Sequence, residues 1–304
     1  MPGSIRALSI LMLFLSAATS FGATMESKSW LLYEQGNAAI SRKEFGEALR
    51  LYKDAVAAAG IFPEAELALG DVYLEEGEFD LARNQYEKAY NQRKAFSIDD
   101  SKYDALYKLA HLYEDQELYK LMEDRLLTIV ADDKHFAETP NSRLRTQVEK
   151  NYFDRGIDHV LLLYSFSDAF ASNAHSKLGW FYYRTGRFSQ SISHLLYSVV
   201  NCVGQITSFL QERDVDFQFS TLQGLLSAVQ KSKELSDYAH GVELYKDLYY
   251  LAGATFAAGY PQHSIDIWKL LSGFESAGPW QGLSLKQVKS PWIEPLLGTA
   301  LKAR

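Results

Sequence analysis

Small and aromatic residues recur early in the chain at a fixed spacing of 34 positions. Glycine and alanine let two helix backbones approach closely, and tyrosines then fill the space towards the next pair. Gly77 supplies a turn between a helix that carries Gly70 and one that begins near Phe79. The matched pairs are Gly36 and Gly70, Phe45 and Phe79, Ala48 and Ala82, Tyr52 and Tyr86, and Ala55 and Ala89. The pattern predicts helix pairs over residues 28–60 and 62–95.

The same pattern returns twice further along the chain. A third unit, 40 positions beyond the second, carries Leu109, Ala110, Tyr113, Tyr119, Leu126 and Ile129. A later copy matches the second unit at five positions, each offset by 109, namely Leu178, Gly179, Tyr182, Gly186 and Phe188. The charged segment over residues 132–141, which contains Pro140, separates the two groups. We therefore expect helix pairs on both sides of a break.

The remaining segments carry weaker signals. We expect one helix over residues 142–164, helices over 217–230 and 235–258, and a loop over 273–290, where Pro279 and glycines occur. Residues 292–303 are expected to form a terminal capping helix, because an open-ended array must cover its last hydrophobic face.

The 34-residue period, with these residues at these offsets, resembles the tetratricopeptide repeat, a pair of antiparallel helices that stacks on its neighbours. The resemblance implies an all-α, right-handed superhelical solenoid with a concave binding surface. It also divides the chain into a repeat block over residues 23–131, a connecting segment and helix over 132–170, and a degenerate repeat block with a capping helix over 171–304.

The N-terminal residues have the pattern of a secretory signal peptide. Arg6 is the first charged residue, and the apolar run from Leu8 to Ala18 covers 11 residues, too few to span a bilayer. Small residues then offer a cleavage site at Ser20-Phe21-Gly22, with Ala18-Thr19-Ser20 as a second choice. Residues 1–22 are therefore predicted to be removed, and the mature chain to be exported, periplasmic or secreted, with no membrane span. An N-terminal anchor or a buried first helix is the alternative.

The charge and the cysteine content of the chain limit which partners and covalent links are possible. A net charge of −7 and the absence of a dense basic run argue against nucleic acid as a partner. Cys202 is the single cysteine, so no intramolecular disulfide can form. It follows an apolar run, which suggests a buried thiol at a helix end, with a reactive or intermolecular role as the alternative.

No motif for catalysis, metal binding or cofactor binding is present. The seven histidines include no pair at helical i, i+4 spacing, and the chain lacks a glycine-rich phosphate loop and a Gly-x-Ser-x-Gly elbow. We therefore expect a non-enzymatic protein with no cofactor and no metal. Catalytic groups can converge from distant positions, so an enzyme without a recognisable motif stays an alternative.

In tetratricopeptide repeats the first helix of each pair lines the concave face, and the resemblance transfers that role by register. The implied partner-binding residues are Tyr33, Asn37, Leu67, Asp71, Glu75, Tyr107, His111, Glu114, Asp115, Trp180 and Tyr183. The clamp by which some relatives hold a chaperone's terminal carboxylate needs Lys, Arg and Asn here, and only Asn37 fits. Two plain alternatives remain: the aromatic residues cover neighbouring helices, and the acids form a solvated helix face.

These observations predict a protein–protein interaction scaffold or adaptor of the bacterial cell envelope, which binds a protein or peptide segment in its concave face. Because four acids are expected on that face, a basic segment is the hypothesis for the partner. The alternative function is a small-ligand or transporter-associated periplasmic binding component. The sequence leaves the oligomeric state open.

Overall fold

The computed structural model describes residues 28–137, 143–166 and 169–294, and these residues form helices and connecting turns without a β-strand. The predicted signal peptide lies outside the described residues. The chain divides into two compact units, Met1–Arg125 and Leu126–Arg304, which we describe separately. In the described part of the chain, no helix has the length and apolar content needed to cross a membrane.

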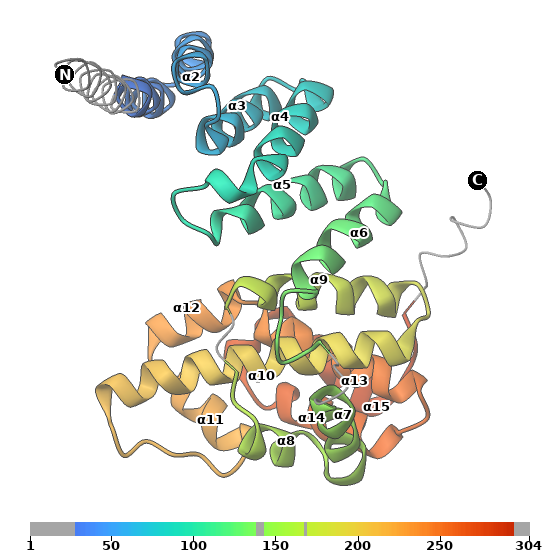
Figure 1. Ribbon diagram of the computed structural model, residues 1–304. Coiled ribbons are helices and arrows are strands. Elements are labelled where there is room, and N and C mark those ends of the chain that lie inside the picture. Colours follow the sequence, from blue (N-terminus) through green and yellow to red (C-terminus); the bar gives the residue numbers. More distant parts are fainter. Residues whose placement is uncertain (1–27, 138–142, 167–168, 295–304) are drawn as a thin grey trace, which may run out of the picture. The chain divides into compact units, whose positions relative to one another are not determined.

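The first unit is a succession of helices, and each of the α-helices between Phe45 and Asp115 packs on the next (Figure 1). A helix over residues 28–41 is followed by α2 (Phe45–Ala59), α3 (Pro63–Glu75), α4 (Phe79–Asn91), the short η1 (Arg93–Ala95) and α5 (Ser101–Asp115). The next helix, α6 (Tyr119–Val130), crosses the division between the units. Pro63 is the first residue of α3, where its missing N–H leaves no helical hydrogen bond unmade. The third unit follows the second by 40 positions rather than 34, and the six extra residues lie within the segment that forms η1 and the turn into α5.

Five of the turns that join consecutive helices in the described residues share one backbone conformation. One residue with positive φ follows the first helix, at Lys43, Gly77, Glu117, Gly186 and Gly259. In the turn after α3, the Gly77 N–H donates to the Leu74 carbonyl (3.0 Å) and the Glu78 N–H to the Tyr73 carbonyl (2.8 Å). The other four turns repeat both bonds at equivalent residues. These bonds satisfy carbonyls that the helix end leaves open.

Close helix crossings explain the small residues of the pattern. A Cβ atom added to Gly36 would lie 2.4 Å from Cε1 of Tyr52, and one added to Gly70 would lie 2.3 Å from Cε1 of Tyr86. In the second unit, a Cβ at Gly179 would lie 2.4 Å from Cγ of Leu195. Each glycine thus makes room for a large side chain of the paired helix, sixteen positions later.

The second unit packs around one long helix. It contains α7 (Leu144–Arg155), α8 (Ile157–Leu163), α9 (Ala169–Arg184), α10 (Phe188–Arg213), α11 (Leu222–Val229), α12 (Lys233–Gly241), α13 (Leu244–Ala257), α14 (Pro261–Ser272), η2 (Glu275–Ala277) and α15 (Pro279–Lys289). Helices α9 and α13 both pack against α10, which is buried almost continuously from Ser191 to Ile206 (Figure 1).

Three helix predictions for the second unit need correction. The single helix expected over residues 142–164 is two helices, because Gly156 adopts a φ of 82° between α7 and α8. The segment 235–258 likewise contains two helices, α12 and α13, and Glu243 between them has a φ of 57°. The helix expected over 217–230 begins only at Leu222, where the Thr221 hydroxyl accepts a hydrogen bond from the Gly224 N–H.

Three further expectations about the C-terminal half also change. The segment 273–290, predicted as a loop, contains α15, which begins at Pro279. The expected capping helix over 292–303 is absent from residues 292–294, and the rest of that range lies outside the described residues. Cys202 is buried as expected but lies within α10 rather than at a helix end.

Candidate functional site

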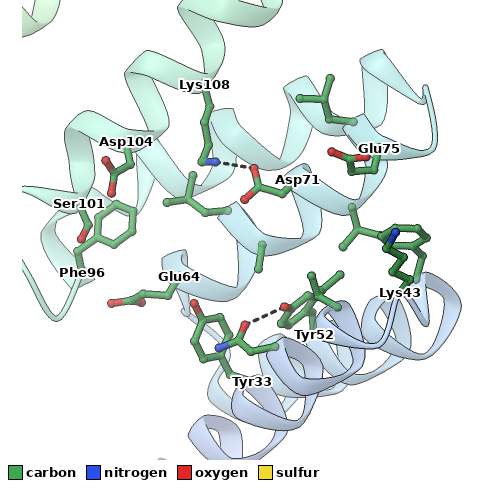
Figure 2. A pocket seen from close by; sticks show the side chains of 17 residues that line it. Tyr33, Lys43, Tyr52, Glu64, Asp71, Glu75, Phe96, Ser101, Asp104 and Lys108 are labelled. Atoms are coloured by element: carbon green, nitrogen blue, oxygen red, sulfur yellow. Dashed lines mark hydrogen bonds and ion pairs between the residues drawn. The ribbon is translucent and has the colours of Figure 1, made fainter. Parts of the chain in front are cut away.

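A groove crosses the first unit over residues 28–41, α3 and α5, which are the first helices of three successive pairs (Figure 2). Its volume is about 790 Å³. We call it the groove, and it is lined by Tyr33, Asn37, Ile40, Lys43, Phe45, Tyr52, Glu64, Leu67, Ala68, Asp71, Val72, Leu74, Glu75, Phe96, Ser101, Asp104 and Lys108.

Five of the residues implied by the repeat register line the groove, namely Tyr33, Asn37, Leu67, Asp71 and Glu75. The others do not. Tyr107, His111, Glu114 and Asp115 belong to α5, where Nδ1 of His111 lies 3.1 Å from Oδ2 of Asp115 on an exposed face. Trp180 and Tyr183 belong to α9 in the second unit.

The floor of the groove is apolar. Helix α3 supplies Leu67, Ala68, Val72 and Leu74, and the helix over residues 28–41 adds Ile40. Leu67 exposes 8% of its surface and Val72 only 1%, so both are anchored in the core beneath. A preformed apolar floor with polar groups at its edges is the usual construction of a ligand-binding cleft.

Two equivalent hydrogen bonds border this floor. The Tyr52 hydroxyl donates to Oδ1 of Asn37 (2.8 Å), and the Tyr86 hydroxyl donates to Oδ1 of Asp71 (2.8 Å). Both partners are shifted by 34 positions between the two bonds. Burial raises the pKa of Tyr52 to about 12, and burial together with the Asp71 carboxylate raises the pKa of Tyr86. Both hydroxyls therefore keep their protons and act as donors at neutral pH.

The Asp71 carboxylate is also paired with a cation from the next helix pair. Nζ of Lys108 on α5 lies 2.7 Å from Oδ1 of Asp71 (Figure 2). The sequence suggested Asp71 as a contact for a basic partner. In the structure its charge is already balanced within the unit, and its oxygen accepts two hydrogen bonds.

One end of the groove gathers acids and aromatic rings. Glu64 at the start of α3 and Asp104 on α5 lie at this end together with Tyr33, Phe96 and Ser101 (Figure 2). Oε1 of Glu64 accepts a hydrogen bond from the backbone N–H of Ser97 (2.7 Å), which positions the carboxylate. Burial raises the pKa of Asp104, an effect that Lys108 opposes and Asp71 reinforces.

Sequence reasoning missed Glu64 and Asp104. They are 40 positions apart in the sequence and share one groove only because α3 and α5 both border it. At the opposite end lie Lys43, Phe45 and Glu75 (Figure 2). Lys43 occupies the positive-φ position of the first interhelical turn, so the turn geometry directs this residue to the groove's edge.

The second unit contains a buried chain of polar side chains. Oδ2 of Asp133 lies 3.2 Å from Nε2 of His175, and Nδ1 of His175 lies 3.0 Å from Nδ1 of His194. Asp133 and His175 are fully buried, and Oδ1 of Asp133 accepts the backbone N–H groups of His135 and Phe136. Burial lowers the pKa of both histidines. This chain therefore holds the segment after α6 against α9 and α10 as a structural contact.

A second buried carboxylate lies between α9, α10 and α13. Asp247 accepts hydrogen bonds from the hydroxyls of Ser176 (2.6 Å) and Ser198, and its pKa is raised by burial to about 7. Ser176 also lines a smaller polar cavity of about 480 Å³, together with Glu243 and Lys246. Among the described residues, no group of three or more His, Cys, Asp or Glu side chains is placed to hold a metal ion.

The two predicted aromatic contacts of α9 have internal partners. Tyr183 is 1% exposed, and its hydroxyl accepts a hydrogen bond from the backbone N–H of Glu294 (3.0 Å). Burial raises its pKa to about 12. Trp180 is half-buried, and Nζ of Lys246 lies 5.9 Å from its ring centre. Both rings thus cover neighbouring elements of the second unit.

No family model matches this chain. Similar proteins include one from Treponema pallidum, 23% identical over 235 residues, which covers 75% of this chain and 61% of that protein. Another, from Borreliella burgdorferi, is 22% identical over 290 residues and covers 86% of this chain and 90% of that protein. Both are described as uncharacterized proteins. The chain thus spans less than two thirds of the Treponema pallidum protein and most of the Borreliella burgdorferi protein.

Proposed function

We propose that this protein is a non-enzymatic interaction scaffold whose first unit binds a segment of a partner protein in the groove. The observation that carries the proposal is an apolar floor on α3, bordered by hydrogen-bonding side chains and open along the first helices of three pairs. Such a surface suits a chain segment that places apolar side chains on the floor and polar groups at the edges.

The resemblance to tetratricopeptide repeats supports this proposal. The repeat pattern, the shared interhelical turn and the Gly–Tyr crossings are those expected if the helix pairs form a right-handed superhelical solenoid. In that fold the first helices line the concave face. The groove lies over the same helices.

The test is to fill the floor with a neutral side chain. Ala68 is half-buried in the groove, whereas Ala57 is exposed on α2 and does not line it. The full chain is used to select from a displayed library of short random peptides, in parallel with Ala68→Trp and Ala57→Trp. Peptides that bind the wild type and Ala57→Trp but not Ala68→Trp support the proposal. Peptides retained equally by all three proteins contradict it, provided that the far-UV spectra agree.

Binding of a small molecule is the second candidate function, and the volume of the groove is the observation that favours it. A volume of about 790 Å³ lies within the range of small-ligand sites, about 300–1,000 Å³. The measurement that separates the two is native mass spectrometry of protein purified from its source cells. A stoichiometric small molecule, lost in Ala68→Trp, favours this candidate over a peptide partner.

The signal pattern of residues 1–22 supports the proposal that this role lies in the cell envelope or the periplasm. Intact-mass measurement of the protein expressed in a bacterial host tests this part separately. A mature chain that begins between Phe21 and Met25 is expected. A product that retains Leu8 to Ala18 would contradict export by cleavage.

A further inference from the structure

The charges in the groove are unevenly distributed. Its lining contains four carboxylates and two ammonium groups, a net charge of −2 when all are ionised. Lys108 is bound to Asp71, so that pair contributes no net charge. Lys43 and Glu75 lie at one end, whereas Glu64 and Asp104 line the other, on either side of Phe96 (Figure 2). The excess negative charge is therefore concentrated at the Glu64–Asp104 end.

Within the described part of the chain, no cationic side chain lies within 4.0 Å of the carboxylates of Glu64 or Asp104. Lys108 also lines the groove, but its ammonium group is held 2.7 Å from Asp71. A carboxylate partly withdrawn from water gains more from a cation than a fully solvated one does. Glu64 is half-buried and its carboxylate is held by the Ser97 N–H, whereas Asp104 is exposed to solvent.

The aromatic rings add a second attraction for the same kind of group. The half-buried Tyr33 and the 6% exposed Phe96 line the groove at the same end as the two acids (Figure 2). The face of an aromatic ring attracts ammonium and guanidinium groups, and its surface packs against their aliphatic stems. Glu64, Asp104, Tyr33 and Phe96 thus combine charge and apolar surface at one end of an apolar floor.

We infer that this end of the groove is a subsite for a lysine or arginine side chain of the bound segment, with Glu64 and Asp104 as its counter-charges. The inference rests on the proposed peptide-binding function and adds the chemistry and the location of its specificity. It also changes the role of Asp71, which orders the groove through Tyr86 and Lys108 rather than contacting the partner's cation.

The test compares peptides selected by the wild type with those selected by a double variant, Glu64→Gln with Asp104→Asn. Both replacements keep an oxygen in place, so the hydrogen bond from the Ser97 N–H to residue 64 can persist. The matched control is Glu76→Gln with Glu78→Gln, which removes the same charge from exposed positions outside the groove. All three proteins are used as full chains.

Peptides selected by the wild type and the control are expected to be enriched in Lys and Arg, and the double variant is expected to lose this enrichment. One selected peptide is then synthesised, and its binding should weaken about tenfold or more in the double variant, since a hydrogen bond to a charged group commonly contributes at least that factor. Added salt should also weaken the binding of this peptide to the wild type more steeply than its binding to the double variant.

Two other outcomes overturn the inference in different ways. In the first outcome, peptides bind the wild type but not Ala68→Trp, so they occupy the groove, yet they are not enriched in Lys or Arg. This result contradicts the cation subsite and leaves the proposed function intact. If no peptide distinguishes the wild type from Ala68→Trp, the proposed function fails and the subsite for a peptide side chain fails with it.

Discussion

The Tyr86 hydroxyl donates a hydrogen bond to the carboxylate of Asp71, 15 positions earlier, across the crossing of α3 and α4. The Tyr52 hydroxyl makes the same bond to Asn37 one repeat earlier. Tyrosine at this repeat position therefore does two things: its ring fills the space above a glycine, and its hydroxyl orders a polar side chain at the groove. Groove polarity and helix packing are coupled through one residue.

Replacing Gly70 tests the packing half of this coupling. Gly70→Leu forces atoms into the space held by the fully buried Tyr86 ring and is expected to destabilise the protein by about 1–3 kcal/mol, as overpacking does. Gly46→Ala is the control, because a Cβ there meets nothing within 4 Å and should stabilise the helix by up to about 1 kcal/mol. Denaturant unfolding of both variants measures the difference, and a Gly70→Leu protein as stable as the wild type would refute the crossing.

A substitution at the positive-φ position of the turns is expected to raise stability rather than lower it. Glu117 holds a φ of 56° where three of the five equivalent turns have glycine. The left-handed region costs a non-glycine residue about 1–2 kcal/mol, so Glu117→Gly is expected to raise stability by about 1 kcal/mol. The reciprocal change, Gly77→Ala, places a Cβ in open space and should lower stability through φ alone. Thermal melts decide; a loss of stability in Glu117→Gly would count against this turn geometry.

The ion pair between Lys108 and Asp71 is expected to contribute little to stability. Their side chains are 35% and 45% exposed, and partly solvated pairs typically couple by about 0.2–1 kcal/mol. A double-mutant cycle with Lys108→Met and Asp71→Asn measures the coupling free energy. The pair Lys120 and Asp124, with 76% and 50% exposure, serves as the comparison and should couple more weakly. A coupling of several kcal/mol in the groove pair would show that water is excluded there.

Asp247 predicts a pH dependence of stability. Burial raises its pKa from 3.8 to about 7 in the folded state, so between these values the folded protein binds a proton that the unfolded chain has released. Stability from this group is therefore greatest at low pH and is lost as the pH rises towards 7, by at most about 1.4 kcal/mol per unit. Asp247→Asn removes the titration. Urea unfolding of both proteins from about pH 4 to pH 7 should show the wild type losing stability relative to the variant, and parallel curves would contradict the assignment.

The sequence predicted the helices best where small residues mark a crossing. Gly70 and Gly179 placed the pairs α3–α4 and α9–α10. The helix predictions were wrong where one residue type is compatible with two different local structures. Pro279 and its neighbouring glycines were interpreted as a loop, yet proline also fits the first turn of a helix, and α15 begins there. Gly156 could continue a helix or end it, and only its φ of 82° shows that it ends α7.

Part of the groove could be predicted from the sequence, because residues on one face of a helix recur at regular spacing. Register along one helix placed Leu67, Asp71 and Glu75 on the same face, because residues three and four apart lie together. Contacts between helices are not periodic along the chain. The pairing of Asp71 with Lys108, and the presence of Glu64 and Asp104 in one groove, depend on how α5 packs beside the preceding pair.

The buried contacts of Asp133 decide where a recombinant fragment of the second unit can begin. The sequence assigned this residue to a connecting segment, but its carboxylate is buried against His175 and accepts two backbone N–H groups from the same turn. A recombinant fragment that starts after this turn would leave His175 and His194 without their acid and expose the apolar surface beneath Phe136. An autonomous second half of this protein therefore has to start upstream of Asp133.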